Sequence, residues 1–177
     1  MPQPGPLPRR VGEIDWRHWK PVDRATLLFV IRRGDLLLMR KKRGLGAGKI
    51  NGPGGRIDPG EEPLECALRE LREELCVTTR SAQLGGELSF QFVDGYSVHV
   101  YVFRSDACEG TPRETPEAEP LWTPLHDIPY GEMWADDRLW LPLLIRRTPF
   151  RGWCVFDGDR LLDYRLEEGY PVRGARG

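Results

Sequence analysis

Residues 55–77 constrain this chain most, because they place several carboxylates on one amphipathic helix directly after a glycine-rich loop. Glu61 and Glu62 suit the positive end of a helix dipole, and Pro63 suits an early helical position that needs no N–H donor. The sequence therefore predicts a helix that begins at these residues.

The spacing of apolar residues along this helix predicts one buried stripe. The leucines that recur at the helical period are Leu64, Leu68, Leu71 and Leu75. The glutamates Glu70, Glu73 and Glu74 stand three and four residues apart and are turned away from the leucines. Like charges at this spacing repel by about 0.2–0.5 kcal/mol per pair, and a divalent cation would turn the repulsion into coordination. A solvated acidic helix face is the alternative interpretation.

The loop before the helix favours a bound ligand. Residues 44–55 read GLGAGKINGPGG, and Lys41, Lys42 and Arg43 stand just before them. Glycine lets the backbone approach a ligand closely, and nearby cations attract phosphate. The glycines fit neither a P-loop nor a Rossmann fingerprint. Together with the acidic helix, the loop indicates metal-assisted chemistry on a polyphosphate.

Residues 55–77 resemble the Nudix box, whose pattern is Gly, five residues, Glu, seven residues, Arg-Glu-aliphatic, one residue, Glu-Glu, one residue, Gly-aliphatic. Every specified position matches except the last glycine, which is Cys76 here. In the family that glycine closes the helix, so its loss is expected to alter the cap rather than the chemistry. Further segments are similar to the oxidised purine nucleoside triphosphatase branch, the 8-oxo-dGTP diphosphatases related to MutT. These segments are residues 41–51, 90–92, 110–112, 128–129, 133–137 and 163–166.

The resemblance implies an α/β (α+β) Nudix fold, with a mixed β-sheet sandwiched between helices, over residues 25–168. Residues 1–24 would be a proline-rich extension and residues 169–177 a flexible tail. Strand pairs are expected at 25–31 with 36–40, at 87–103 and at 153–166. A helix is expected at 137–147, kinked or shortened by Pro142.

The resemblance also implies a metal site for Mg²⁺, with Mn²⁺ as an alternative. The implied ligands are Glu70, Glu73, Glu74, Glu117 and the backbone carbonyl of Gly54. Gly55, Glu61 and Arg69 would support the site, with Arg69 paired to a box carboxylate. Either Glu73 or Glu117 would be the catalytic base. The alternative for Glu117 is a solvated charge in the acidic loop 114–119.

The implied substrate-binding residues are Thr26, Lys41, Leu45, Asn51, Phe90, Phe92, Trp134, Asp136 and Asp137. Paired carboxyls can share a proton when burial and repulsion raise one pKa, which would let Asp136 and Asp137 read a purine edge. The alternatives are that the phenylalanines fill the core and that Asp136 only caps the following helix. Leu45 and Ile50 replace aromatic residues of the related enzymes, so the preference among oxidised, methylated and normal purines stays open.

The resemblance implies a magnesium-dependent pyrophosphohydrolase that splits modified purine nucleoside triphosphates, such as 8-oxo-dGTP, into monophosphate and pyrophosphate. Such an enzyme would cleanse the nucleotide pool. The alternatives are hydrolysis of another nucleoside diphosphate derivative, such as a dinucleoside polyphosphate or ADP-ribose, and a noncatalytic nucleotide-binding module.

The composition agrees with a one-domain cytoplasmic enzyme. The chain has 177 residues with 40% hydrophobic content, enough for one core. A net charge of −1 favours a free nucleotide over a nucleic-acid polymer as partner. The four cysteines form no CxxC pair, and no apolar run is long enough for a membrane span. We therefore expect reduced thiols, no membrane partner and a monomer.

Overall fold

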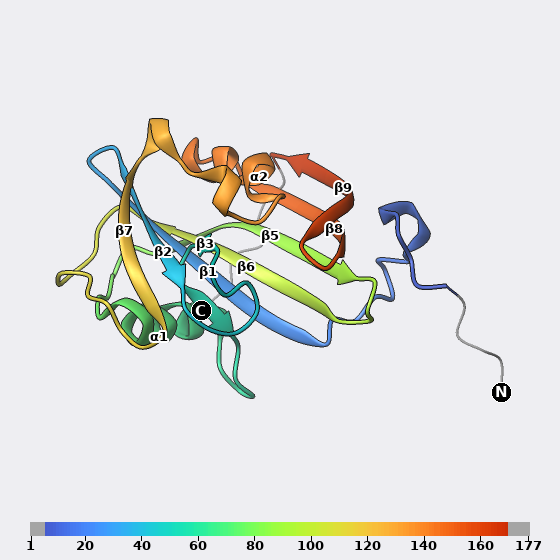
Figure 1. Cartoon of the computed structure of the whole chain (residues 1–177), viewed down its shortest axis with the longest axis horizontal. Helices are drawn as coiled ribbons and strands as arrows, with labels where there is room; N and C mark the ends of the chain where they lie inside the picture. The colour runs from blue at the N-terminus through green and yellow to red at the C-terminus, as the bar shows by residue number, and fades with distance from the viewer. Residues whose placement is uncertain (1–5, 170–177) are drawn as a thin grey trace.

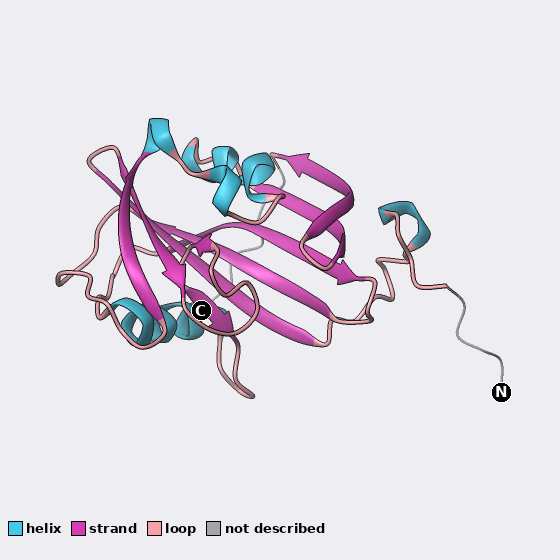
Figure 2. Cartoon of the chain, in the orientation of Figure 1, coloured by secondary structure: helices cyan, strands magenta, loops and turns pink. Residues whose placement is uncertain are grey.

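Strands from distant parts of the chain form one mixed sheet (Figures 1 and 2), which a computed structural model describes for residues 6–169. Its main path runs β3-β2-β1-β6-β5-β8-β9, while β4 pairs with β1 and β7 pairs with β2. The strands are β1 (Asp23–Arg32), β2 (Asp35–Lys41), β3 (Ile50–Asn51), β4 (Gly54–Arg56), β5 (Gln83–Phe92), β6 (Ser97–Ser105), β7 (Ala118–Pro124), β8 (Phe150–Asp157) and β9 (Arg160–Glu168). The β1–β6 and β5–β8 pairs are parallel, and the other pairs are antiparallel. The predicted mixed sheet is confirmed.

The two α-helices, α1 (Pro63–Leu75) and α2 (Asp137–Ile145), cover opposite faces of the sheet (Figure 1). Side chains along a strand point alternately to its two faces. In β6, Val100 and Val102 accordingly join the core cluster that contains α2, whereas Phe103 joins the cluster that contains α1. The predicted arrangement of a sheet between helices is therefore confirmed.

Both ends of α1 follow from local sequence. The helix begins after Glu62, whose backbone N–H donates to the Glu65 carboxylate at 3.0 Å, and Pro63 occupies the first turn. It ends at Cys76, which adopts the left-handed conformation (φ 62°) that glycine usually takes at this position. The predicted start is present, whereas the expected change in the cap is not, because Cys76 keeps the left-handed cap conformation.

The prediction that Leu64 belongs to the buried stripe of α1 is wrong. Leu71 and Leu75 are fully buried, but Leu64 is 40% exposed. The buried stripe instead runs through Ala67, Leu71 and Leu75, and Leu64 lies in the first turn, before that stripe begins. The spacing of the leucines correctly predicted which face of α1 is buried. It did not predict that the first turn of the helix lies outside the buried stripe.

All three predicted strand pairs are present, but β7 lies partly where an acidic loop was expected. Ala118 is fully buried and Glu119 pairs with Arg40 of β2. Such a long-range pairing leaves no local signal in the sequence. Helix α2 ends at Ile145, two residues earlier than predicted, and contains Pro142 within its length.

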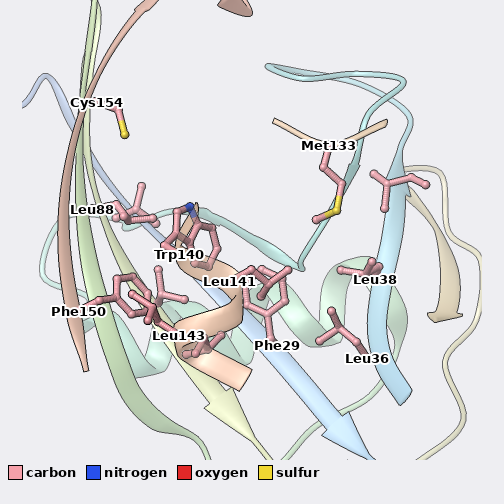
Figure 3. Close-up of a cluster of buried hydrophobic side chains, with 14 of the residues drawn as sticks. Phe29, Leu36, Leu38, Leu88, Met133, Trp140, Leu141, Leu143, Phe150 and Cys154 are labelled. Atoms are coloured by element: carbon pink, nitrogen blue, oxygen red, sulfur yellow. The ribbon is translucent and has the colours of Figure 1, made fainter. Parts of the chain in front are cut away.

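The larger core cluster lies between the sheet and α2. Trp140 of α2 packs edge-on against Phe29 of β1 and stacks with Phe150 of β8, with ring centroids 5.7 and 5.6 Å apart. Figure 3 shows Trp140 among the labelled members of this cluster, which include Leu88 and Leu141. Helix α2 is thereby fixed on the sheet, together with the residues that precede it.

The described part of the N-terminal extension packs on β5, β8 and β9. The short 3-10 helix η1 (Val11–Glu13) begins at Val11, whose N–H donates to the Asp163 carboxylate at 2.8 Å. The Trp19 indole donates to Gln91 Oε1 at 2.9 Å. The remaining parts of the predicted extension and tail, residues 1–5 and 170–177, lie outside the described residues. Within residues 6–169, none of the helices is both long and apolar enough to cross a membrane.

Candidate active site

The glycine loop meets strand β1 and helix α1 so closely that only glycine fits at two positions. A Cβ on Gly54 would lie 1.9 Å from the Thr26 carbonyl oxygen, and one on Gly55 would lie 2.4 Å from Glu70 Oε1. The strand pairing of Gly55 with Thr26 holds the loop in this place. The Gly54 N–H donates to Glu74 Oε1 at 2.8 Å, which ties the loop to the acidic face of α1.

Three carboxylates converge beside this joint. Ligand oxygens of Glu70, Glu74 and Glu117 all lie within 4.8 Å of one another. Burial, with the negative charge of Glu70 nearby, raises the pKa of Glu74 to about 8. Burial also raises the pKa of Glu70, although Arg69 opposes the shift. Three clustered acids are unfavourable as bare anions, and their hard oxygen donors fit a divalent cation. The cluster could therefore hold a metal ion.

Arg69 organises the acids around this cluster. Its guanidinium donates to both oxygens of Glu61, at 2.8 and 3.0 Å, and to Glu70 Oε1 at 2.8 Å. The hydrogen bonds from Arg69 lower the pKa of Glu61 to about 2. Glu73, with its side chain 51% exposed, also accepts from Arg69, at 3.2 Å, and is not part of the three-carboxylate cluster.

Glu117 reaches the cluster from a distant part of the chain. It directly precedes β7, whose Ala118 pairs with Lys41 of β2, next to the glycine loop. Arg43 donates to Glu117 Oε1 at 2.9 Å. The long-range strand pairing thus places the downstream glutamate beside the box glutamates.

A cavity of about 640 Å³ joins the acidic cluster to an aromatic chamber. Its lining includes Gly54, Gly55, Glu70, Glu74 and Glu117 at the acidic end. It also includes every predicted substrate-binding residue, namely Thr26, Lys41, Leu45, Asn51, Phe90, Phe92, Trp134, Asp136 and Asp137. Of the other predicted site residues, Glu61, Arg69 and Glu73 lie outside its lining. The volume falls within the range of about 300–1,000 Å³ that is usual for small-molecule sites.

Two adjacent aspartates in the chamber are buried and differ in their partners. Asp136 is 2% exposed and accepts a hydrogen bond from the Trp140 indole at 2.7 Å. Its side chain makes no capping bond to α2, so the interpretation of Asp136 as a simple helix cap does not hold. Asp137 is 3% exposed, and its Oδ2 has no hydrogen-bond partner among the described residues.

Burial and mutual repulsion disfavour the ionisation of both acids at once. Burial raises the pKa of Asp136 to about 6, and burial with the adjacent Asp136 raises the pKa of Asp137 well above its ordinary value. A protonated Asp137 can donate a hydrogen bond while Asp136 accepts one. The pair can therefore read a ligand edge that presents both a donor and an acceptor.

Aromatic rings form the walls of the chamber. Trp134 lies edge-on to Phe156 and to Phe92, with centroids 5.5 and 6.3 Å apart, and Phe92 stacks on Phe156 at 5.6 Å. Phe92 is 7% exposed and belongs to the core cluster as well as to the cavity wall. Phe92 can therefore both fill the core and form part of the cavity wall.

The sequence reasoning missed several cavity residues. Asp23 accepts a 2.9 Å hydrogen bond from the Tyr96 hydroxyl, and both residues line the cavity. Trp140 and Phe156 line it as well. Strand alternation could have found Phe156, because it follows Cys154 on the inner face of β8. Asp23 begins β1 and Tyr96 lies in the turn between β5 and β6, so the two carry no comparable signal.

Similarity to known proteins agrees with this site geometry. The model of the NUDIX domain family matches residues 21–144, and the chain belongs to this family. An oxidized purine nucleoside triphosphate hydrolase from Danio rerio is 41% identical over 145 residues, which cover 81% of this chain and 93% of the relative. The corresponding hydrolase from Mus musculus is 40% identical over the same shares. A crystal structure of a MutT protein from Bacillus halodurans superimposes with a TM-score of 0.75 at 27% identity, covering 82% of this chain and 98% of that one.

Proposed function

We propose that this protein is a pyrophosphohydrolase of oxidised or otherwise modified purine nucleoside triphosphates, such as 8-oxo-dGTP. It would release the monophosphate and pyrophosphate and so remove damaged nucleotides from the pool. The observation that carries the proposal is one cavity that joins a metal-competent carboxylate cluster to a buried aspartate pair between aromatic walls. The two relatives named as oxidized purine nucleoside triphosphate hydrolases support the substrate class.

The aspartate pair and the aromatic walls would select the base. Trp134 and the phenylalanines offer flat apolar surfaces, and stacking of this kind contributes about 1–3 kcal/mol per base. Asp137 in its protonated form would donate to the purine edge, and Asp136, held by Trp140, would accept from it. A site that hydrogen-bonds a specific edge discriminates strongly against an analogue that lacks it.

The acidic end would hold the divalent metal, which we propose to be Mg²⁺, with Mn²⁺ as an alternative. Glu70, Glu74 and Glu117 would hold it, with Glu73 and the Gly54 carbonyl as the further ligands that the resemblance to the Nudix family implies. When bound, such an ion neutralises phosphate oxygens and lowers the pKa of a coordinated water. Arg69 and Glu61 would keep the glutamates in position.

We propose Glu117 as the general base, because it lines the cavity next to Glu70 and Glu74. Glu73 is the alternative; both carboxylates accept from an arginine, but Glu73 lies outside the three-carboxylate cluster and the cavity lining. A base must reach the proton that it removes through at most one water. The two assignments are separated by measuring kcat for Glu117→Gln and Glu73→Gln under identical conditions. The variant that loses more kcat identifies the base, and we expect this to be Glu117→Gln.

We also propose that residues 25–168 form the hydrolase domain, with residues 1–24 and 169–177 as extensions. The active form would be a cytoplasmic monomer that acts on free nucleotides. Size-exclusion chromatography with light scattering checks the oligomeric state.

A metal-dependent turnover screen tests the proposed reaction. Its substrates are normal, oxidised and methylated purine triphosphates, dinucleoside polyphosphates and ADP-ribose. We expect an oxidised purine triphosphate to give the highest kcat/KM and pyrophosphate to appear with the monophosphate. A higher kcat/KM for ADP-ribose or a dinucleoside polyphosphate would overturn the substrate class.

The variant Glu74→Gln tests the metal assignment. It should lose metal-dependent turnover and retain the fold, because Gln keeps the acceptor for the Gly54 amide but removes the charge. Glu119→Gln is the matched control, since Glu119 is exposed, lies two residues from Glu117 and is outside the cavity lining. Near-normal turnover in Glu74→Gln would contradict the assignment.

A further inference from the structure

A second cavity, of about 510 Å³, lies on the sheet face opposite the candidate active site. In β6, His99 and Tyr101 line the second cavity, whereas Val98 and Val100 line the first. Since neighbouring strand residues point to opposite faces, the sheet separates the two cavities. The wall of the second cavity is completed by Trp16, Arg17 and Trp19 of the N-terminal extension. The proposed hydrolase reaction uses none of these residues.

The second cavity concentrates positive charge. Arg17, Arg24, Arg151 and Arg165 line it, and Glu87 is the one acid in its lining among the described residues. Glu87 is already engaged by His99 at 3.2 Å and by Arg151 at 3.5 Å. Arg165 has its counter-charge outside the lining, in Glu167 at 3.8 Å, whereas the charges of Arg17 and Arg24 have none within the lining, in a chain whose net charge is −1. This excess favours an anionic occupant.

Several of these side chains are held in place. The Arg165 guanidinium lies 4.2 Å from the Trp153 ring centroid, and the Arg24 guanidinium donates to the Tyr101 hydroxyl at 2.9 Å. Stacked and hydrogen-bonded guanidinium groups lose less conformational entropy when they bind a phosphate. Arg24 and Arg165 are thereby oriented at the wall of the second cavity, while Arg17 stands exposed at its rim.

The extension adds two fixed aromatic rings. The Trp19 indole donates to Gln91 Oε1 at 2.9 Å, and the Trp16 indole donates to the Val11 carbonyl at 2.9 Å. The two rings lie 5.1 Å apart, and both line the cavity. Apolar rings next to guanidinium groups suit a ligand that combines a flat base with phosphate.

We propose that the second cavity binds a nucleotide, with its phosphate on Arg17, Arg24 and Arg165 and its base against Trp16 and Trp19. This site is separate from the proposed hydrolase site and does not require turnover. Its occupant needs no metal, because arginines rather than carboxylates face the phosphate.

The indole N–H signals of the tryptophans distinguish the two cavities in one NMR titration. Trp16 and Trp19 report on the second cavity, while Trp134 and Trp140 report on the first. The probe is GMP in the presence of EDTA, added to the full chain. We expect saturable shifts of the Trp16 and Trp19 signals, with a dissociation constant distinct from that of the Trp134 and Trp140 signals.

The double variant Arg24→Gln/Arg165→Gln should weaken GMP binding at Trp16 and Trp19 by about tenfold or more, since two charge-assisted contacts are lost. It should leave kcat/KM and the shifts of Trp134 and Trp140 unchanged. Arg160→Gln is the matched control on β9, because Arg160 is exposed and lies outside both linings. A thermal melt of each variant verifies its fold.

Three results would overturn the proposal. The first is that GMP does not shift the Trp16 and Trp19 indole signals, or that it shifts them equally in the double variant. The second is inorganic phosphate binding there as tightly as GMP, which would indicate an anion site without base recognition. The third is a single-stranded oligonucleotide binding far more tightly than GMP, which would indicate a polymer site. Each result can be read whether or not the hydrolase proposal holds.

Discussion

The Trp140 indole donates a 2.7 Å hydrogen bond to Asp136 Oδ2 inside the core, and this bond fixes one member of a buried carboxyl pair. The adjacent Asp137 lines the same cavity with its Oδ2 unpaired among the described residues. Two neighbouring acids therefore differ in their contacts: Asp136 is bonded to Trp140, and Asp137 has one oxygen without a hydrogen-bond partner among the described residues.

Asp137→Asn should stabilise the protein at neutral pH. Burial raises the pKa of Asp137, so the folded state binds a proton more tightly than the unfolded state does. Stability therefore falls as pH rises from the unfolded pKa of about 4 through the higher folded pKa. Asn carries no such penalty, so urea midpoints should favour the variant at pH 8, with the difference shrinking toward pH 4.

The exposed Asp127→Asn is the matched control for this titration, and its midpoints should follow the wild type. Asp137→Asn should also lose discrimination between purines, because Asn presents a different set of donors and acceptors. A lower stability of Asp137→Asn than of the wild type at pH 8 would contradict the interpretation that Asp137 is protonated and lacks a partner for Oδ2.

Gly55→Ala should damage activity more than stability. The added Cβ would lie 2.4 Å from Glu70 Oε1, so the glutamate must move away from the cluster. Because a displacement of about 1 Å can cost about 100-fold in rate, we expect a comparable loss in kcat/KM. Gly131→Ala, where a Cβ meets nothing within 4 Å, should behave as wild type. Equal activity of the two variants would contradict the proposed role of the Gly55–Glu70 contact.

Cys76→Gly should stabilise the protein. Cys76 ends α1 with φ 62°, a left-handed conformation that costs a non-glycine residue about 1–2 kcal/mol. We expect a gain of about 1 kcal/mol in the free energy of unfolding, measured by urea denaturation. Cys76→Ala removes the thiol but keeps the strain, so it should show no such gain. If Cys76→Gly is no more stable than Cys76→Ala, the interpretation that the left-handed conformation strains Cys76 is contradicted.

Leu45→Phe should strengthen substrate binding. Leu45 lines the cavity with 55% of its surface exposed, and a ring there could contact the base. Partial stacking predicts a KM about fivefold lower for the preferred purine triphosphate, with kcat little changed. Leu64→Phe, on the exposed end of α1, should leave KM unchanged and serves as the control. An unchanged KM in Leu45→Phe would indicate that the base does not reach this residue.

The features that the sequence predicted correctly are mostly local. The start of α1 near Pro63, the helical period of Leu71 and Leu75, and the three strand pairs are set by residues close in sequence. The box spacing likewise brings Glu70 and Glu74 to one face of one helix.

The features that were missed depend on contacts between distant segments. Strand β7 forms by pairing with β2, and the Tyr96–Asp23 hydrogen bond joins the β5–β6 turn to the start of β1. The exposure of Leu64 depends on how far the sheet extends beneath α1. The second cavity arises only when Trp16 and Trp19 meet the outer face of β5 and β6. These are tertiary relationships that local patterns do not encode.

The most direct test of the proposed function is a competition assay with 8-oxo-dGTP and dGTP at equal concentration in one reaction with Mg²⁺. The ratio of the two monophosphates at low conversion equals the ratio of the two kcat/KM values. We predict an excess of 8-oxo-dGMP in the wild type and a ratio closer to one in Asp137→Asn. Equal or faster hydrolysis of dGTP by the wild type would contradict the sanitation of oxidised purine nucleotides.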